Sequence, residues 1–204
     1  MFTGIVQAYL PIKKIEHQTG LMSFAVEFPS DFLVDLKIGA SVALDGVCLT
    51  VVRIDGHDVS FDAMMETLRL TTLQYLKEGQ KINVERSARL SDEVGGHRVS
   101  GHVSTLAEIV SVQEPENNKV VTFEVSPDEL KYIFQKGFIA LDGCSLTVTN
   151  VDAKKGTFDV WLIPETLART GFGKKTVGDK VNVEFDPTTQ VIVDTVERIM
   201  KQQS

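Results

Sequence analysis

One short stretch occurs twice in this chain, and that repeat constrains the fold more than any other feature. Residues Leu44–Val51 recur 97 positions later as Leu141–Val148, and both copies run from an Asp-Gly pair into Leu-Thr-Val. Asp-Gly is typical of tight turns, and Leu-Thr-Val is typical of strands. Two copies of one turn-and-strand unit predict two barrels or sheets built alike, and 204 residues allow two small domains.

Further pairs extend the repeat over both halves of the chain. The halves share an opening segment (residues 2–6 and 99–103), the tripeptide Glu-Thr-Leu (66–68 and 165–167) and a closing strand (79–85 and 178–184). Many short strands separated by glycine-containing turns favour closed antiparallel barrels, because closure leaves no exposed strand edge. We therefore predict an all-β chain with one barrel in each half.

The predicted domains are an N-terminal barrel over residues 1–97, a C-terminal barrel over residues 98–187 and a helix over residues 188–204. Residues 87–98 form the linker between the barrels. In the tail, Val193, Val196 and Ile199 recur at helical spacing. A helix this short is unstable alone in water, so its apolar stripe must pack either on the barrels or on copies of itself. We favour self-association.

Composition excludes several classes of protein. The net charge of −7 argues against a nucleic-acid partner and, more weakly, against an anionic membrane surface. No apolar run is long enough to span a bilayer. The first nine residues have no basic run before an apolar core, and two cysteines are too few for a disulfide framework. We expect a cytoplasmic protein with no membrane partner.

These motifs together resemble the riboflavin synthase family, alpha-chain type. The resemblance lies in the opening Met1-Phe2-Thr3-Gly4-Ile5-Val6, the paired Leu-Thr-Val and Glu-Thr-Leu motifs, and Gly95-Gly96-His97 leading to Ser100-Gly101-His102. It covers essentially the whole chain. It implies two similar six-stranded antiparallel Greek-key β-barrels and a C-terminal α-helix through which three chains associate as a homotrimer.

The resemblance also implies a reaction. Enzymes of this family move a four-carbon unit between two molecules of 6,7-dimethyl-8-ribityllumazine, which gives riboflavin and 5-amino-6-ribitylaminouracil. Neither a metal nor a redox cofactor takes part. The active site is expected between the N-terminal barrel of one chain and the C-terminal barrel of a neighbour, with two substrate molecules in each site. Lumazine synthase is a candidate partner.

The family's binding residues match two sets of positions in this sequence, one for each pocket. The first pocket is expected from Cys48, Leu49, Thr50, Asp62, Ala63, Met64, Met65, Glu66 and Thr67, completed by Gly101, His102 and Val103. The second is expected from Ser145, Leu146, Thr147, Trp161, Leu162, Ile163, Pro164, Glu165 and Thr166, completed by Gly4, Ile5 and Val6. Phe2 and Lys136 are expected to contribute as well. Each opening segment would thus serve the other half's ligand.

Differences between the halves indicate catalytic residues. His102 stands where the first half has Ile5, and imidazole can take a proton from a ring methyl near neutral pH. His102 could equally orient the ligand by hydrogen bonding. Cys48 aligns with Ser145, and either could act as a nucleophile or donate a hydrogen bond. For Cys48 a buried, unreactive thiol is favoured, because no cation lies beside it in the sequence.

Three further positions match the family's site. Ser41 is expected near the acceptor substrate. Lys136 either stabilises developing negative charge or is a solvated surface lysine. Asp186, which aligns with Ser87, is either a site carboxylate or a turn residue at a strand end. We assign His17, His57 and His97 to surface or linker positions, and a metal site is not expected because further ligands at fitting spacing are missing.

Two other functions are compatible with a duplicated barrel. Non-catalytic lumazine-binding fluorescent proteins share the duplicated fold, but one competent and one degraded pocket would then be expected. Here both halves keep their Leu-Thr-Val and Glu-Thr-Leu motifs, which favours an enzyme. A flavin reductase would need a nicotinamide-binding α/β half, and the sequence has no strand, glycine loop and helix in that order.

Overall fold

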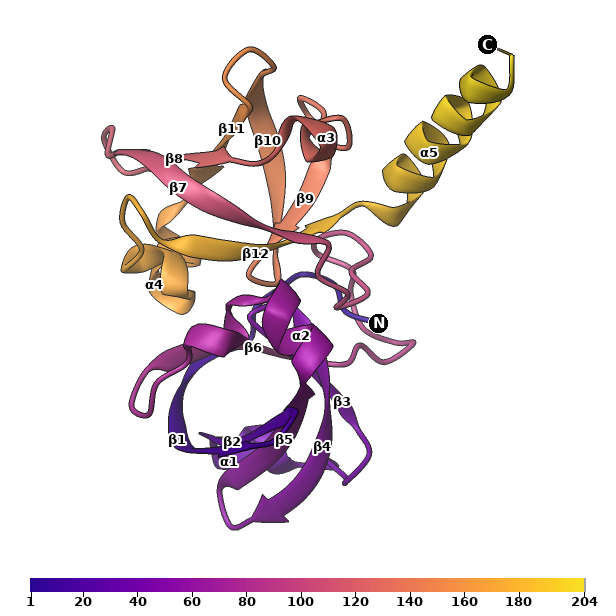
Figure 1. The fold of residues 1–204 in the computed structure, drawn as a ribbon. Coiled ribbons are helices and arrows are strands. Elements are labelled where there is room, and N and C mark those ends of the chain that lie inside the picture. The colour runs from indigo at the N-terminus through magenta and orange to yellow at the C-terminus, as the bar shows by residue number, and fades with distance from the viewer. Residues whose placement is uncertain (204) are drawn as a thin grey trace.

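The computed structural model describes residues 1–203, which form two closed six-stranded antiparallel barrels, one above the other, and a projecting helix (Figure 1). The first barrel has the strand order β1-β2-β5-β4-β3-β6. Its strands are β1 (Ala8–Gln18), β2 (Leu21–Glu27), β3 (Ser41–Leu44), β4 (Val47–Asp55), β5 (Asp58–Met64) and β6 (Lys81–Arg86). The hairpin-linked strands β3, β4 and β5, with β6 returning to lie beside β3, make a Greek key.

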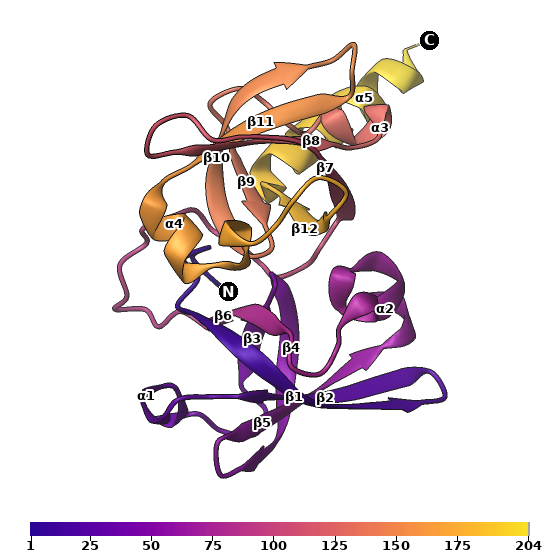
Figure 2. The same cartoon turned by 90° about the vertical axis from the view of Figure 1, so that its left-hand side faces the viewer.

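The second barrel repeats this order as β7-β8-β11-β10-β9-β12. Its strands are β7 (Thr105–Gln113), β8 (Lys119–Glu124), β9 (Phe138–Leu141), β10 (Cys144–Asp152), β11 (Thr157–Leu162) and β12 (Lys180–Phe185). The predicted fold class is therefore confirmed, as Figure 2 also shows from the side.

Short helices occur at matching places in the two barrels. A single turn follows the second strand of each, α1 (Ser30–Leu33) and α3 (Pro127–Leu130), and the Glu-Thr-Leu tripeptides lie in α2 (Met65–Leu70) and α4 (Pro164–Arg169). One turn of 3-10 helix follows each of the latter, at Thr72–Tyr75 and Gly171–Gly173. A capping box begins α3, because the Ser126 backbone N–H donates to the Glu129 carboxylate at 3.0 Å.

The duplication extends to irregularities of the ladders. Strand register shifts between Ile12 and Lys14 in the first barrel and between Ile109 and Ser111 in the second. Bulges of this kind bend a strand and add twist, so the two barrels are curved at the same points. The hairpin between β10 and β11 is longer than the one between β4 and β5, so the offset between matching residues rises from 97 to 99 beyond it.

Each barrel has its own apolar core, but the opening segments are exchanged between the cores. Val6, from the start of the chain, is buried in the core of the second barrel, and Val103 packs against the core of the first. The segments pair with each other where they cross, through Phe2 and Val99, with N···O distances of 2.8 and 3.0 Å. Each half of the chain therefore completes the other half's barrel.

The repeated Asp-Gly turns meet where the barrels touch. The Asp45 carboxylate accepts from Asn83 N–H at 2.8 Å, and Asp142 accepts from Asn182 N–H at 2.7 Å. The two asparagine amides then donate across the junction, Asn83 to the Asp142 carbonyl at 3.0 Å and Asn182 to the Asp45 carbonyl at 2.8 Å. This reciprocal set of bonds relates the barrels by an approximate two-fold axis.

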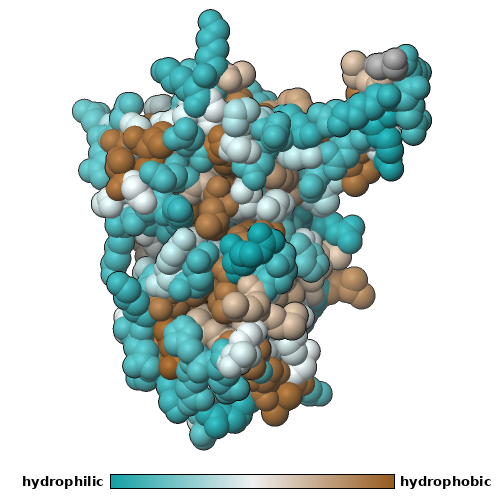
Figure 3. Space-filling view, viewed as in Figure 1, coloured by the Kyte–Doolittle hydropathy of each residue, from teal (hydrophilic) through white to brown (hydrophobic). Residues whose placement is uncertain are grey.

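The C-terminal helix α5 (Pro187–Gln202) projects from the second barrel and exposes apolar side chains (Figure 3). Asp186 caps it by accepting from Thr189 N–H at 2.7 Å. Lys131 pairs with Glu197 at 2.7 Å, which ties the polar side of the helix to the barrel. Within residues 1–203, no helix has the length and apolar character needed to cross a membrane.

Candidate active site

The opening segment Gly4-Ile5-Val6 crosses onto strand β10 of the second barrel. Ser145 N–H donates to the Gly4 carbonyl at 2.7 Å. Gly4 has φ +73°, and a Cβ built on it would lie 2.6 Å from Ser145 Cβ. Only glycine allows this backbone conformation and this approach together, so the segment can lie flat against Ser145.

The segment Gly101-His102-Val103 makes the equivalent crossing onto strand β4 of the first barrel. Cys48 N–H donates to the Gly101 carbonyl at 2.9 Å, and a Cβ on Gly101 would lie 2.4 Å from Cys48 Cβ. The structure thus brings each predicted opening segment to the strand with which the sequence paired it.

A cavity of about 230 Å³ opens in the second barrel at this crossing. It is lined by predicted site residues from three parts of the chain: Gly4, Ile5, Val6, Ser145, Leu146, Ile163, Glu165 and Thr166. Cys144, Arg169 and Thr170 line it as well and were not predicted. Arg169 could have been found from its i,i+4 spacing to Glu165, with which it forms an ion pair.

The side chain of His97 reaches Ser145 in this cavity wall, so this linker residue also contacts the candidate site. His97 is only 8% exposed, and its Nδ1 lies 2.6 Å from Ser145 Oγ. The imidazole stacks on the Phe138 ring at 5.1 Å. No local pattern indicates this pair, because His97 and Ser145 are 48 residues apart and His97 has no counterpart in the repeat.

Burial lowers the pKa of His97 below its ordinary value, and the charge of Asp186 opposes this shift. The imidazole is therefore mainly neutral near pH 7, so that in one tautomer Nδ1 can accept the Ser145 hydroxyl proton. Burial also raises the pKa of the neighbouring Cys144 thiol. Cys144 is consequently a poor nucleophile, whereas Ser145 has a base beside it.

His102 lies exposed on the other crossing segment. Its Nδ1 is 3.1 Å from Ser100 Oγ, so the imidazole is anchored at one nitrogen and open at the other.

Thr67 is half-buried on α2, and Glu66 pairs there with Arg69 at 2.7 Å.

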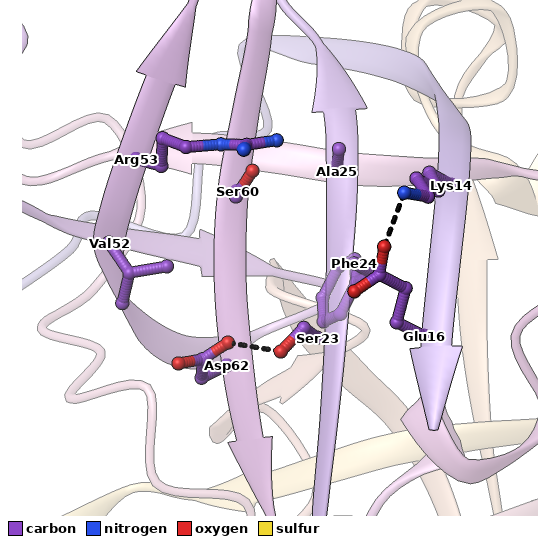
Figure 4. A pocket seen from close by; sticks show the side chains of 9 residues that line it. All are labelled: Lys14, Glu16, Ser23, Phe24, Ala25, Val52, Arg53, Ser60 and Asp62. Atoms are coloured by element: carbon purple, nitrogen blue, oxygen red, sulfur yellow. Dashed lines mark hydrogen bonds and ion pairs between the residues drawn. The ribbon is translucent and has the colours of Figure 1, made fainter. Parts of the chain in front are cut away.

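Asp62 faces a different hollow, a groove of about 240 Å³ on the outer face of the first barrel (Figure 4). It accepts a hydrogen bond from Ser23 Oγ at 2.6 Å. The groove crosses strands β1, β2, β5 and β4 and is lined by Lys14, Glu16, Ser23, Phe24, Ala25, Val52, Arg53, Ser60 and Asp62. Asp62 is its single predicted site residue.

The remaining predicted residues fall into three groups. Phe2, Leu49, Ala63 and Leu162 are buried within this chain. Exposed side chains belong to Thr50, Met64, Met65, Lys136, Thr147, Trp161 and Pro164, and the Ser41 side chain is half-buried on β3. Asp186 caps α5, and this contact fits its interpretation as a turn residue at a strand end. Among residues 1–203, no cluster of three or more His, Cys, Asp or Glu could hold a metal.

Comparison with known proteins identifies the family. The sequence pattern of the lumazine binding domain matches residues 3–87 and again residues 100–186. The riboflavin synthase of Escherichia coli K12 is 51% identical over 201 residues, which cover 98% of this chain and 93% of that protein. The chain belongs to the riboflavin synthase family.

Family members from distant organisms are also similar. The riboflavin synthase of Schizosaccharomyces pombe is 40% identical and covers 91% of this chain and 89% of that protein. Among solved structures, LumP in complex with riboflavin is 27% identical, with a TM-score of 0.84 over 91% of this chain and all of LumP. LumP has also been solved with 6,7-dimethyl-8-(1'-D-ribityl) lumazine, with a TM-score of 0.81. Riboflavin synthases and a lumazine binder thus share this duplicated barrel.

Proposed function

We propose that this chain catalyses the riboflavin synthase reaction. Two molecules of 6,7-dimethyl-8-ribityllumazine exchange a four-carbon unit and leave as riboflavin and 5-amino-6-ribitylaminouracil. The two products contain all the atoms of the two substrates, so the reaction needs a site for a matched pair. The observation that carries the proposal is the identity of 51% to a riboflavin synthase across 98% of the chain, which includes both halves.

The duplicated crossing segments support a site of this kind. Each barrel carries the same glycine-closed crossing, which would hold one flat ring system. Holding two reactants together in reacting geometry can supply roughly 7–11 kcal/mol of the barrier. Positioning by the two pockets would therefore account for much of the rate.

We assign roles to the residues by which the halves differ. Ser145, with His97 as its base, would add to a ring carbon of the acceptor lumazine and thereby activate it. His102 would take the proton from the ring methyl of the second molecule. Lys136, Asp186, Ser41 and Cys48 are assigned supporting roles at the edges of the pockets, and the remaining predicted binding residues line them.

The complete site would form between chains. We propose that three copies associate through α5, whose exposed residues include Val191, Ile192 and Val196. The first barrel of one copy would then face the second barrel of its neighbour. The domain limits at residues 97 and 187, the cytoplasmic location and an association with lumazine synthase stay predictions.

The alternative is a non-catalytic lumazine or flavin binder, which the likeness to LumP supports. Incubation of the purified protein with 6,7-dimethyl-8-ribityllumazine alone separates the two functions. Riboflavin absorbance should appear, with one riboflavin formed for every two lumazines consumed. Tight lumazine binding without any riboflavin would instead establish the binder.

A further inference from the structure

A buried glutamate on the last strand of the first barrel holds the first opening segment. Glu85, on β6, is 3% exposed. Its carboxylate accepts three hydrogen bonds, from Thr3 N–H at 2.6 Å, from the Thr3 hydroxyl at 2.8 Å and from Gly4 N–H at 3.1 Å. Such charge-assisted bonds are about twice as strong as neutral ones, so the carboxylate fixes this segment firmly.

A second glutamate repeats the arrangement in the second barrel. Glu184, on β12, is 5% exposed and accepts from Ser100 N–H at 2.6 Å, from the Ser100 hydroxyl at 2.8 Å and from Gly101 N–H at 2.9 Å. Three donors converge on each carboxylate. A glutamine at either position would lose at least one of these hydrogen bonds, because its side-chain NH2 group would face an N–H donor.

Each opening segment is hydrogen-bonded to the glutamate of one barrel and closes the pocket of the other barrel. Glu85 belongs to the first barrel, but Gly4 packs on Ser145 in the second. Glu184 belongs to the second barrel, but Gly101 packs on Cys48 in the first. Among the described residues, neither carboxylate hydrogen-bonds to Ser145 or Cys48, although the charge of Glu85 helps to raise the pKa of Cys144.

We propose that Glu85 and Glu184 are positioning residues, each of which holds the opening segment that closes the ligand pocket of the opposite barrel. The geometry of one pocket is thereby set by a side chain of the other domain. This inference rests on the proposed function, which makes the two pockets ligand sites, but its test uses no substrate. The two can therefore fail separately.

The two free cysteines report on the two pockets. Cys48 lies under Gly101 in the first barrel, and Cys144 lines the cavity closed by Gly4 and Val6 in the second. We would measure modification of each thiol by a disulfide reagent, resolved by mass spectrometry of the two peptides. Glu184→Gln should speed modification of Cys48 and leave Cys144 unchanged. Glu85→Gln should do the reverse, and so should Thr3→Ala, which keeps the Glu85 charge that acts on the pKa of Cys144.

Loss of one hydrogen bond to a charged group should raise the rate at the affected cysteine roughly ten- to a hundredfold. Glu108→Gln, at an exposed glutamate on β7, is the matched control and should change neither rate. If Glu184→Gln or Glu85→Gln does not fold, Ser100→Ala and Thr3→Ala remove one donor each and keep the carboxylates.

The crossed pattern would support the proposal. Three results would overturn it: a rise confined to the cysteine of the mutated barrel, an equal rise at both cysteines, or no rise at either. The first two are expected of glutamates that merely stabilise their own barrel or the whole fold.

Discussion

His102 is held in one tautomer by its neighbours. Ser100 has one hydroxyl proton, which it donates to Glu184 at 2.8 Å. Its oxygen can then only accept, so the His102 nitrogen 3.1 Å away, Nδ1, must carry a proton. The Nε2 lone pair is left free, and this is the nitrogen open to solvent and ligand.

We therefore expect ¹⁵N NMR of the neutral imidazole to show His102 protonated at Nδ1. Ser100→Ala removes the acceptor and should shift the population towards the form protonated at Nε2. His57, whose Nδ1 lies 2.7 Å from the Phe28 carbonyl, should keep its spectrum and serves as the internal control. Finding the Nε2-protonated form in the unmodified protein would contradict this assignment.

The contact between His97 and Ser145 leads to a second prediction, which concerns the rate of the reaction. Its 2.6 Å contact with Ser145 Oγ suits a base that activates the hydroxyl. Removal of a positioned acid or base typically costs about 10²–10⁴-fold in rate, so His97→Ala should lower kcat by at least roughly a hundredfold while riboflavin still binds. His57→Ala is the control. A variant with normal kcat and only a raised KM would reduce His97 to a binding residue.

At the scale of elements, α5 differs from every strand and helix of the barrels because it has no repeat. No residue of α5 is buried in the chain, and its apolar side chains point outward. Exposed apolar stripes of this kind are usually covered by a partner. Polar contacts at Lys131 and Tyr132 hold the helix in place without covering the stripe.

If three chains associate through α5 as proposed, truncation after Gln190 should give monomers, measured by sedimentation or light scattering. Because each complete site would need two chains, riboflavin formation should fall with the trimer while lumazine binding to the single barrels persists. Val196→Glu leaves the helix intact and should have the same effect. A truncated chain that remains trimeric would show that another surface makes the assembly.

At the scale of the whole molecule, two carboxylates meet one lysine at the junction of the barrels. Burial, and then the charge of Asp142, raise the pKa of Asp45 to about 8. Burial raises the pKa of Asp142 as well, although Lys175 lies 3.0 Å from it and opposes the shift. Burial disfavours the charge on Lys175, but the two carboxylates raise its pKa overall.

This junction predicts a loss of stability with rising pH. The pKa of Asp45 is higher in the folded chain than in the unfolded chain, so its contribution is complete below about pH 4 and disappears as pH rises through about 8. Each bound proton can change the free energy of unfolding by up to about 1.4 kcal/mol per pH unit. Asp45→Asn should flatten this decline in urea unfolding between pH 5 and 8, whereas exposed Asp55→Asn should not. Parallel curves for the Asp45 variant and the unmodified protein would contradict the assignment.

The repeat was sufficient to predict the two barrels, because matched motifs report on matched backbones, whereas the crossing segments and most of the residues around the Ser145 cavity were predicted from the family resemblance. The repeat could not predict contacts made by residues that have no counterpart in the other half of the chain. His97 belongs to the linker, and its approach to Ser145 depends on how the linker folds back over the second barrel. Asp62 faces the outer groove because side chains alternate along β5, where Phe61 and Ala63 face the core. The placement of His97 is set by tertiary packing that no local pattern records.

The exchange of Val6 and Val103 between the two cores has a consequence for biosynthesis. During synthesis the first barrel leaves the ribosome before Val103 does, so that barrel first lacks one side chain of its wall. Thr3 and Gly4 can already bind Glu85, but Val6 has no core to enter until the second barrel has folded. We therefore expect the cavity beside Ser145 to close only after strand β12 has left the ribosome.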